Sequence, residues 1–171
     1  LGYPRILSAY ANSFVGDVSV VDWQEDYLDD TAYFGIISGD PAISSTGAVE
    51  RLRISSNGTG TISTLIDTGR PVTAKPHLTK DGQGRRWVFF GTGRLFEAAD
   101  NATTAQNRFY GLYEPVDASG VETSAKVFDS GLFNITNIQV KDTGAVSDGA
   151  SGSVLMPDTT QVDTFNRLKF E

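Results

Sequence analysis

The stretch Arg86-Trp87-Val88-Phe89-Phe90-Gly91-Thr92-Gly93-Arg94-Leu95-Phe96-Glu97 decides the predicted fold of this chain. After a polar loop, a second run of the same kind follows: Arg108-Phe109-Tyr110-Gly111-Leu112-Tyr113-Glu114. Both runs are rich in aromatic residues, which favour strands, and each contains a glycine where a side chain would obstruct the backbone or a close neighbour. We therefore predict two paired strands, with Gly91 and Gly111 at crowded positions.

Turn-forming clusters divide the rest of the chain into short strand-like pieces. The clearest hairpin signal is Asp81-Gly82-Gln83-Gly84, because its residues adopt a positive φ at little cost. Alternating apolar residues between such clusters predict mostly antiparallel strands. The expected strand regions are Tyr10–Val15, Val18–Trp23, Val49–Ile54, Arg86–Gly91 and Phe109–Glu114, with further β-like runs at Thr61–Asp67 and Ala125–Phe128.

An internal echo indicates how these strands are organised. Gly16 and Gly47, 31 residues apart, are each followed by apolar residues at alternate positions. Four-stranded blades of a β-propeller produce such patterns at about 40 residues per repeat. The spacing here is irregular, so the echo adds only modest support for such blades. The predicted fold class is mainly β, with antiparallel meanders, and its relation to a partial or modified β-propeller rests chiefly on the family resemblance described below.

One segment near the C-terminus departs from the β pattern. Val162, Phe165 and Leu168 fall on one face of a helix, and Asp158 offers a capping side chain with Gln161 three positions later. These features predict a short C-terminal helix over residues 159–169.

Composition limits the classes of partner. The 171 residues carry a net charge of −7 and are long enough for one domain with its own core, and no apolar run is long enough to span a membrane. Residues 71–110 hold 6 basic against 3 acidic groups, a local excess too small for a nucleic-acid footprint. With no cysteine, the chain has no disulfide framework and no thiolate metal site.

The residues that usually carry catalysis are scarce. His77 is the only histidine and no Gly-x-Ser-x-Gly elbow occurs, so a nucleophile triad is not expected. Gly91-Thr92-Gly93 lacks the third glycine and the following helix of a dinucleotide site. An acidic run could present oxygens to Ca²⁺ through Asp26, Asp29 and Asp30, but the alternative of a solvated acidic loop is favoured because the Asp-x-Asp-x-Asp-Gly spacing is absent.

The first block also carries a family resemblance. Phe90-Gly91-Thr92-Gly93-Arg94, followed by Asp100-Asn101 and then Phe109-Tyr110-Gly111, resembles a strand, Asp-rich loop and strand of the C-terminal domain of the PilY/PilC family. Members of that family are type IV pilus biogenesis factors and tip-associated adhesins.

Two further blocks extend the resemblance. The segment from Pro71 to Pro76 is similar to the family's entry into the same strand pair. Residues 10–23, with Gly16, Asp17 and Asp22, are similar to a family hairpin but lack its usual Leu-Trp pair. Together the blocks lie within residues 10–114, and residues 115–171 carry little of the pattern.

The resemblance implies a single domain, residues 1–171, that is a fragment of a longer bacterial protein. It implies quinoprotein-like propeller blades, a non-catalytic role in pilus assembly and adhesion, and a location on the cell surface or at the pilus tip. The implied partners are pilins, minor pilins and host or abiotic surfaces, with neither nucleic acid nor a membrane span. No cofactor is expected: many relatives place an Asp-rich calcium loop before the residue matching Tyr10, but Leu1–Ala9 contain no carboxylate.

Two other function classes remain open from the sequence. A quinoprotein-type propeller enzyme is disfavoured by the presence of only two tryptophans and by the lack of an evident quinone and calcium cage. A lectin-like carbohydrate module would use aromatic side chains as stacking platforms, although their placement on alternating strands favours a core role. The aromatic candidates are Tyr10, Phe14, Trp23, Tyr27, Tyr33 and Phe34.

Overall fold

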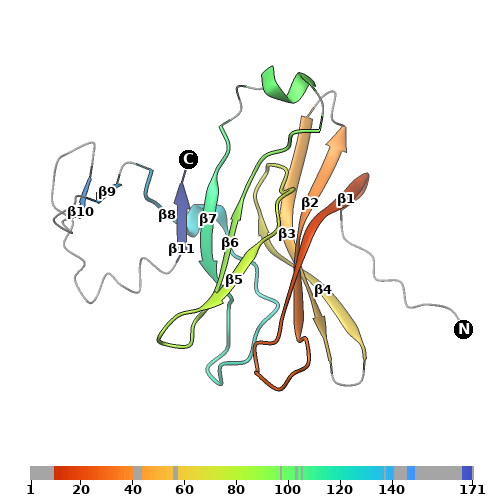
Figure 1. Cartoon of the computed structure of the whole chain (residues 1–171), viewed down its shortest axis with the longest axis vertical. Coiled ribbons are helices and arrows are strands. Elements are labelled where there is room, and N and C mark those ends of the chain that lie inside the picture. Colours follow the sequence, from red (N-terminus) through yellow and green to blue (C-terminus); the bar gives the residue numbers. More distant parts are fainter. Residues whose placement is uncertain are drawn as a thin grey trace, which may run out of the picture.

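The computed structural model describes residues 10–40, 44–55, 58–96, 98–102, 104, 106–136, 138–140, 146–148 and 167–170. These residues form two principal, mostly antiparallel sheets, joined face to face by a shared core, and a two-stranded ribbon (Figure 1). The fold is therefore mainly β, as predicted. The strands are β1 Ser13–Val21, β2 Thr31–Asp40, β3 Ser44–Ile54, β4 Gly60–Asp67, β5 His77–Lys80, β6 Arg86–Gly91, β7 Phe109–Tyr113, β8 Phe133–Asn134, β9 Ile138–Val140, β10 Val146–Asp148 and β11 Arg167–Phe170.

The first sheet is a four-stranded meander in the order β1-β2-β3-β4, and every neighbouring pair is antiparallel. The predicted hairpin between Tyr10 and Trp23 is wrong, because its two halves belong to the single strand β1. The chain does not reverse at Gly16 and Asp17; it continues through a bulge between Val15 and Val18, where the pairing with β2 shifts register. A bulge inserts extra residues and bends a strand without ending it.

The second sheet has the order β5-β6-β7-β11-β8. The predicted Asp81 hairpin is confirmed: β5 and β6 are antiparallel, and the N–H of Asp81 donates to the carbonyl of Arg85 at 3.0 Å. The next pair, β6 and β7, contains the two aromatic runs of the sequence in antiparallel register, with Phe89 opposite Gly111. Both predicted strands are therefore confirmed.

The predicted C-terminal helix is wrong wherever the structure describes it. Residues 167–169 belong to β11, which pairs antiparallel with β7 and parallel with β8 (Figure 1), while residues 159–166 lie outside the described part. The helices in the described ranges are short 3₁₀ segments, Ala98–Ala102 and Asp129–Gly131. Within those ranges no helix has the length and apolar character that a membrane crossing requires.

Of the remaining predicted strands, two are confirmed and one is wrong. Val49–Ile54 and Thr61–Asp67 lie within β3 and β4. The run Ala125–Phe128 is not a strand and contributes only an isolated parallel bridge, between Val127 and Ile66. Val127 is nevertheless fully buried in the core between the sheets, whereas Phe128 is exposed.

A single core fills the space between the two sheets. Its members come from both inner faces, and full burial of each large apolar side chain contributes about 2 kcal/mol. Tyr110 stacks on Phe90 with 5.0 Å between ring centroids, which ties β7 to β6 within this core. The buried members are Trp23, Tyr33, Val49, Leu65, Ile66, Val72, Val88, Phe90, Tyr110, Leu112 and Val127.

Residues 68–73, here called the crossing segment, connect the meander to the second sheet. The N–H of Thr68 donates to the carbonyl of Gly47 at 3.0 Å, and the N–H of Val72 donates to that of Ile36 at 3.3 Å. The carbonyl of Thr73 accepts the N–H of Asp17 at 3.1 Å, at the bulge of β1. The crossing segment thus lies directly on the backbones of three neighbouring strands.

Three glycines make this close approach possible. A Cβ at Gly35 would lie 2.1 Å from the carbonyl oxygen of Val72, and one at Gly47 would lie 2.4 Å from that of Arg70. A Cβ at Gly16 would lie 2.8 Å from the carbonyl oxygens of Val72 and Thr73. Glycine is therefore needed at these three positions, on β1, β2 and β3, where backbone carbonyls of the crossing segment come this close.

Gly91 and Gly111, the two glycines singled out in the sequence, differ in how much space surrounds them. A Cβ at Gly111 would lie 2.7 Å from Cε1 of Phe89, whereas one at Gly91 would meet only the carbonyl oxygen of Arg108, at 3.9 Å. The expectation of crowding is thus confirmed for Gly111 and wrong for Gly91. We predict that Gly111→Ala lowers the free energy of unfolding by about 1–3 kcal/mol, because the Phe89 ring must move.

Urea denaturation of the two alanine variants measures this difference. Gly91→Ala is the matched control in the adjacent strand, and we expect its stability to change by no more than about 0.5 kcal/mol. Equal losses in the two variants would show that contact with Phe89 is not what requires glycine at position 111.

Candidate functional site

A buried ion pair connects the two sheets behind the candidate site. Arg51 on β3 pairs with Glu114, which follows β7, and both side chains are fully buried. The hydroxyl of Tyr33 donates to Oε2 of Glu114 at 2.8 Å, and Nε1 of Trp23 donates to that hydroxyl oxygen at 3.1 Å. Burial raises the pKa of Glu114 to about 7, against the attraction of Arg51, and burial also raises the pKa of Tyr33.

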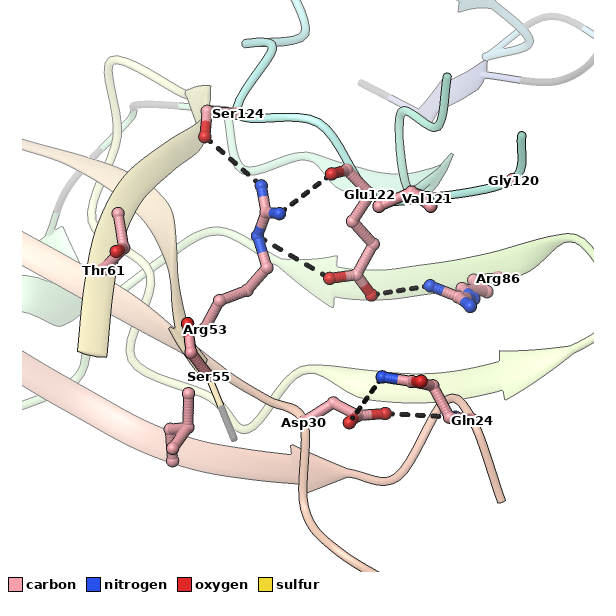
Figure 2. A pocket seen from close by; sticks show the side chains of 11 residues that line it. Gln24, Asp30, Arg53, Ser55, Thr61, Arg86, Gly120, Val121, Glu122 and Ser124 are labelled. Atoms are coloured by element: carbon pink, nitrogen blue, oxygen red, sulfur yellow. Dashed lines mark hydrogen bonds and ion pairs between the residues drawn. The ribbon is translucent and has the colours of Figure 1, made fainter. Parts of the chain in front are cut away.

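A polar cleft opens at the end of this network. It has a volume of about 460 Å³ and lies between the loop after β1, the ends of β3 and β4, β6, and residues 120–124 (Figure 2). Its charged lining residues are Arg53, Arg86, Glu122 and Asp30. The others are Gln24, Ile54, Ser55, Thr61, Gly120, Val121 and Ser124.

Glu122 forms ion pairs with both arginines of the cleft. Nη1 of Arg86 donates to its Oε1 at 2.8 Å, Nε of Arg53 lies 3.7 Å from its Oε2, and the hydroxyl of Thr31 donates to Oε2 at 3.2 Å. The guanidinium of Arg86 also lies over the ring of Trp23, 5.6 Å from its centroid. The carboxylate and both guanidinium groups are therefore held in place by one another (Figure 2).

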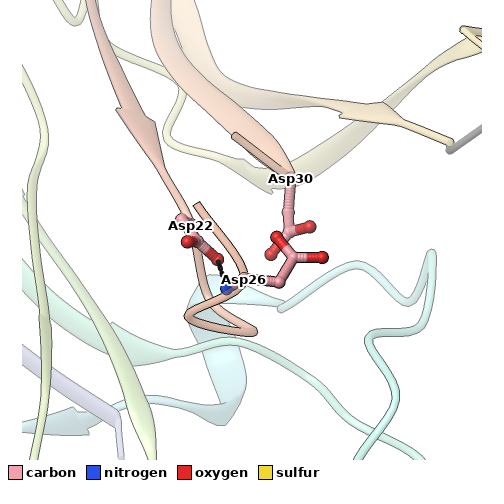
Figure 3. A group of neighbouring side chains, drawn as sticks. All are labelled: Asp22, Asp26 and Asp30. Atoms are coloured by element: carbon pink, nitrogen blue, oxygen red, sulfur yellow. Dashed lines mark hydrogen bonds between the residues drawn. The ribbon is translucent and has the colours of Figure 1, made fainter. Parts of the chain in front are cut away.

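The second candidate is the acidic loop, residues 22–30, between β1 and β2. It brings carboxylate oxygens of Asp22, Asp26 and Asp30 within 4.8 Å of one another (Figure 3). Two of the three predicted calcium candidates, Asp26 and Asp30, are in this group. The third, Asp29, is exposed and is not a member, and Asp22 takes its place.

Backbone N–H groups already donate hydrogen bonds to carboxylate oxygens of this acidic group. Oδ1 of Asp22 accepts the N–H of Glu25 at 2.6 Å, and its Oδ2 accepts that of Tyr27 at 2.7 Å. Although desolvation acts in the opposite direction, these bonds hold the pKa of Asp22 below its ordinary value. Oδ2 of Asp30 likewise accepts the N–H of Trp23 at 2.8 Å. The carboxylates therefore stabilise a tight loop in which Glu25 and Tyr27 have positive φ angles of 62° and 70°.

We predict that the chain binds Ca²⁺ weakly, with a dissociation constant no tighter than about 10⁻⁴ M. The reason is that Ca²⁺ needs six to eight oxygens, and in this loop backbone donors compete for Asp22 and Asp30. Calorimetric titration with calcium chloride measures the affinity. Micromolar binding, retained after Asp22, Asp26 and Asp30 are all replaced by asparagine, would contradict both the expected weakness and the location.

The residues of the resemblance are structural in this chain. Phe90 and Tyr110 lie in the core, while Thr92 and Gly93 follow β6, where Gly93 forms an isolated parallel bridge with Val72. The N–H of Gly93, at a φ of 132°, donates to the carbonyl of Pro71 at 2.7 Å, and Oγ1 of Thr92 accepts the N–H of Arg108 at 2.8 Å. These bonds attach the residues after β6 to the crossing segment and to the start of β7.

Three more of these positions hold neighbouring segments together. Arg94 pairs with Asp100 at 2.7 Å, which anchors the 3₁₀ segment after β6. The carbonyl of Pro76 accepts the hydroxyl of Ser19, which joins β1 to the start of β5. Phe109 lies opposite Gly91 and stacks on Phe89 with 6.3 Å between ring centroids.

The other side chains considered from sequence are dispersed. His77 is exposed at the start of β5. Among the aromatic candidates for sugar stacking, Trp23, Tyr33 and Phe34 are buried, whereas Phe14 and Tyr27 are exposed on different elements. The sequence did not predict the polar cleft, and of its charged lining residues only Asp30 was singled out, as a calcium candidate. The others come from positions 53, 86 and 122 and form no local motif.

Taken together, the fold defines a class: a two-sheet β domain in which a four-stranded meander packs on a second antiparallel sheet. The chain is similar in structure to the C-terminal domain of PilY1 from Pseudomonas aeruginosa, with a TM-score of 0.60 and 15% sequence identity. That likeness covers 96% of this chain and 40% of the other, so this chain spans well under half of the matched structure. It supports a PilY1-like, propeller-related fold. Comparison with family models and with curated proteins finds no match.

Proposed function

We propose that this chain is a domain of a type IV pilus-associated protein that supports pilus assembly and extension and contributes to attachment. The observation that carries the proposal is the structural likeness to the PilY1 C-terminal domain over 96% of the chain. The sequence blocks within residues 10–114 add to it, since their motifs resemble those of the PilY/PilC family.

The proposed role is non-catalytic and requires no cofactor. In support of it, the motif residues Gly93, Thr92 and Pro71 form hydrogen bonds that hold the chain after β6 against the crossing segment and the start of β7. Such residues maintain a scaffold, and a scaffold's function is carried by its surface. The proposed partners are pilins and minor pilins, and host or abiotic surfaces outside the cell, so that the site of action is the cell surface or the pilus.

In-frame deletion of the region that encodes this chain, in the bacterium that carries it, tests the proposal. We expect less pilin in the fraction sheared from the cell surface and weaker attachment, with both restored by the wild-type gene. Complementation with Gly131→Ala, a change in open space, should also restore them. Normal piliation together with normal attachment in the deletion strain would refute the proposal.

A further inference from the structure

The polar cleft has the properties of a preformed binding site. Its volume of about 460 Å³ falls in the range of small-ligand sites. The side chain of Glu122 is only 7% exposed, yet its carboxylate borders the cleft, where Arg86 and Arg53 hold it (Figure 2). The hydroxyl of Thr31 also donates to this carboxylate. A ligand that contacts these groups therefore need not order them first, which lowers the entropic cost of binding.

The charges of the cleft cancel. Among its lining residues, the cations are Arg53 and Arg86, and the anions are Glu122 and Asp30. Both arginines pair with Glu122, and Asp30 accepts hydrogen bonds from the side-chain amide and the N–H of Gln24, each at 3.0 Å. An anionic or a cationic ligand would thus have to compete with existing partners for its counter-charge.

The remaining lining groups are hydroxyls and hydrogen-bonding side chains. Ser55, Thr61 and Ser124 offer hydroxyls that both donate and accept, and the Glu122 carboxylate has more lone-pair positions than its donors fill. Ile54 and Val121 supply apolar surface, so that the wall of the cleft is almost as apolar as it is polar. A lining that mixes donors, acceptors and apolar patches suits a sugar, whose ring carries hydroxyl groups as well as apolar C–H faces.

We propose that this cleft binds a neutral carbohydrate. Adjacent sugar hydroxyls would donate to Glu122 and accept from Arg86, while the hydroxyls of Ser55 and Ser124 would complete the contacts. The site stands apart from the proposed pilus role, because it concerns binding by the purified chain alone and is tested without pili.

Nuclear magnetic resonance titration of the full 171-residue chain tests the proposal. The probes are neutral sugars (glucose, galactose, mannose, N-acetylglucosamine, fucose and lactose) and two charged relatives of glucose, glucosamine and glucuronate. We expect at least one neutral sugar to shift the amide signals of Gln24, Ser55, Val121 and Ser124 saturably. The charged relatives should bind no more tightly than that sugar.

A matched pair of variants locates the binding. Val121→Trp places a bulky ring in the cleft, and Val20→Trp makes the same change on β1, where the valine is 51% exposed and lies outside it. We expect Val121→Trp to weaken binding by about tenfold or more and Val20→Trp to leave it unchanged. The proposal is overturned if no neutral sugar shifts the cleft signals, if a charged relative binds more tightly, or if Val121→Trp leaves the affinity unaltered.

Discussion

Gly35→Ala is expected to destabilise the protein by about 3 kcal/mol or more, enough to unfold a substantial fraction of a domain of ordinary stability. The added Cβ would lie 2.1 Å from the carbonyl oxygen of Val72 and 2.7 Å from its carbonyl carbon. These are backbone atoms of the crossing segment, which is bonded to the carbonyl of Ile36 on β2, so neither side can withdraw cheaply. Chemical denaturation followed by circular dichroism measures the loss.

Gly131→Ala is the control for this change, because a Cβ there meets nothing within 4 Å and no positive φ opposes it. We expect its stability to lie within about 0.5 kcal/mol of the wild type. A Gly35→Ala protein as stable as the control would mean that the crossing segment does not press on β2 as described.

Arg51→Met is expected to cost about 3–5 kcal/mol at pH 8, because it leaves the Glu114 carboxylate buried without its cation. The variant also loses the hydrogen bonds that Arg51 donates to Oγ of Ser63 at 2.9 Å and to the carbonyl of Ala125 at 2.7 Å. Arg85→Met removes a partly exposed pair with Asp81 and is the matched control, with an expected loss of about 1 kcal/mol or less.

The cost of Arg51→Met should depend on pH. The pKa of Glu114 is about 7 in the folded protein and ordinarily 4.5, so its folded form holds the proton more tightly. Its contribution to stability is therefore full below pH 4.5 and is lost as the pH rises through 7, by up to about 3 kcal/mol in the wild type. Removing Arg51 deepens the loss at pH 8, while at pH 5 the protonated carboxyl tolerates burial better.

Denaturation curves at pH 5 and pH 8 give the comparison directly. Glu114→Gln should flatten the dependence on pH, because the amide does not titrate. A cost for Arg51→Met that is equal at both pH values would show that the charge on Glu114 does not control the link between the sheets.

Local patterns predicted β6 and β7 well, because the two aromatic runs and the Asp81 turn carry their own signals. They did not single out β2, Thr31–Asp40. They failed where tertiary contacts decide. The glycine at position 16 reads as a hairpin turn, but the bond from Asp17 to Thr73 makes it a bulge. Residues 167–169 have helical spacing, but pairing with β7 makes them a strand.

The candidate site could be predicted only in part. The acidic loop could be predicted because its aspartates are close in the sequence. That Asp22 belongs to the group and Asp29 does not depends on how the loop folds. The polar cleft could not be predicted from the sequence, because Arg53, Arg86 and Glu122 come together only when the two sheets pack. Neither their charges nor their spacing along the chain indicates that these three residues lie together in the fold.

Immunogold electron microscopy, with antibodies raised against this chain, tests the proposed pilus role most directly. The cells compared are the wild type and a strain from which the encoding region has been deleted. We expect gold particles along pili, at their tips or on the cell surface of the wild type, and none on the deletion strain. Labelling confined to the cell interior, with unlabelled pili on the same cells, would contradict it.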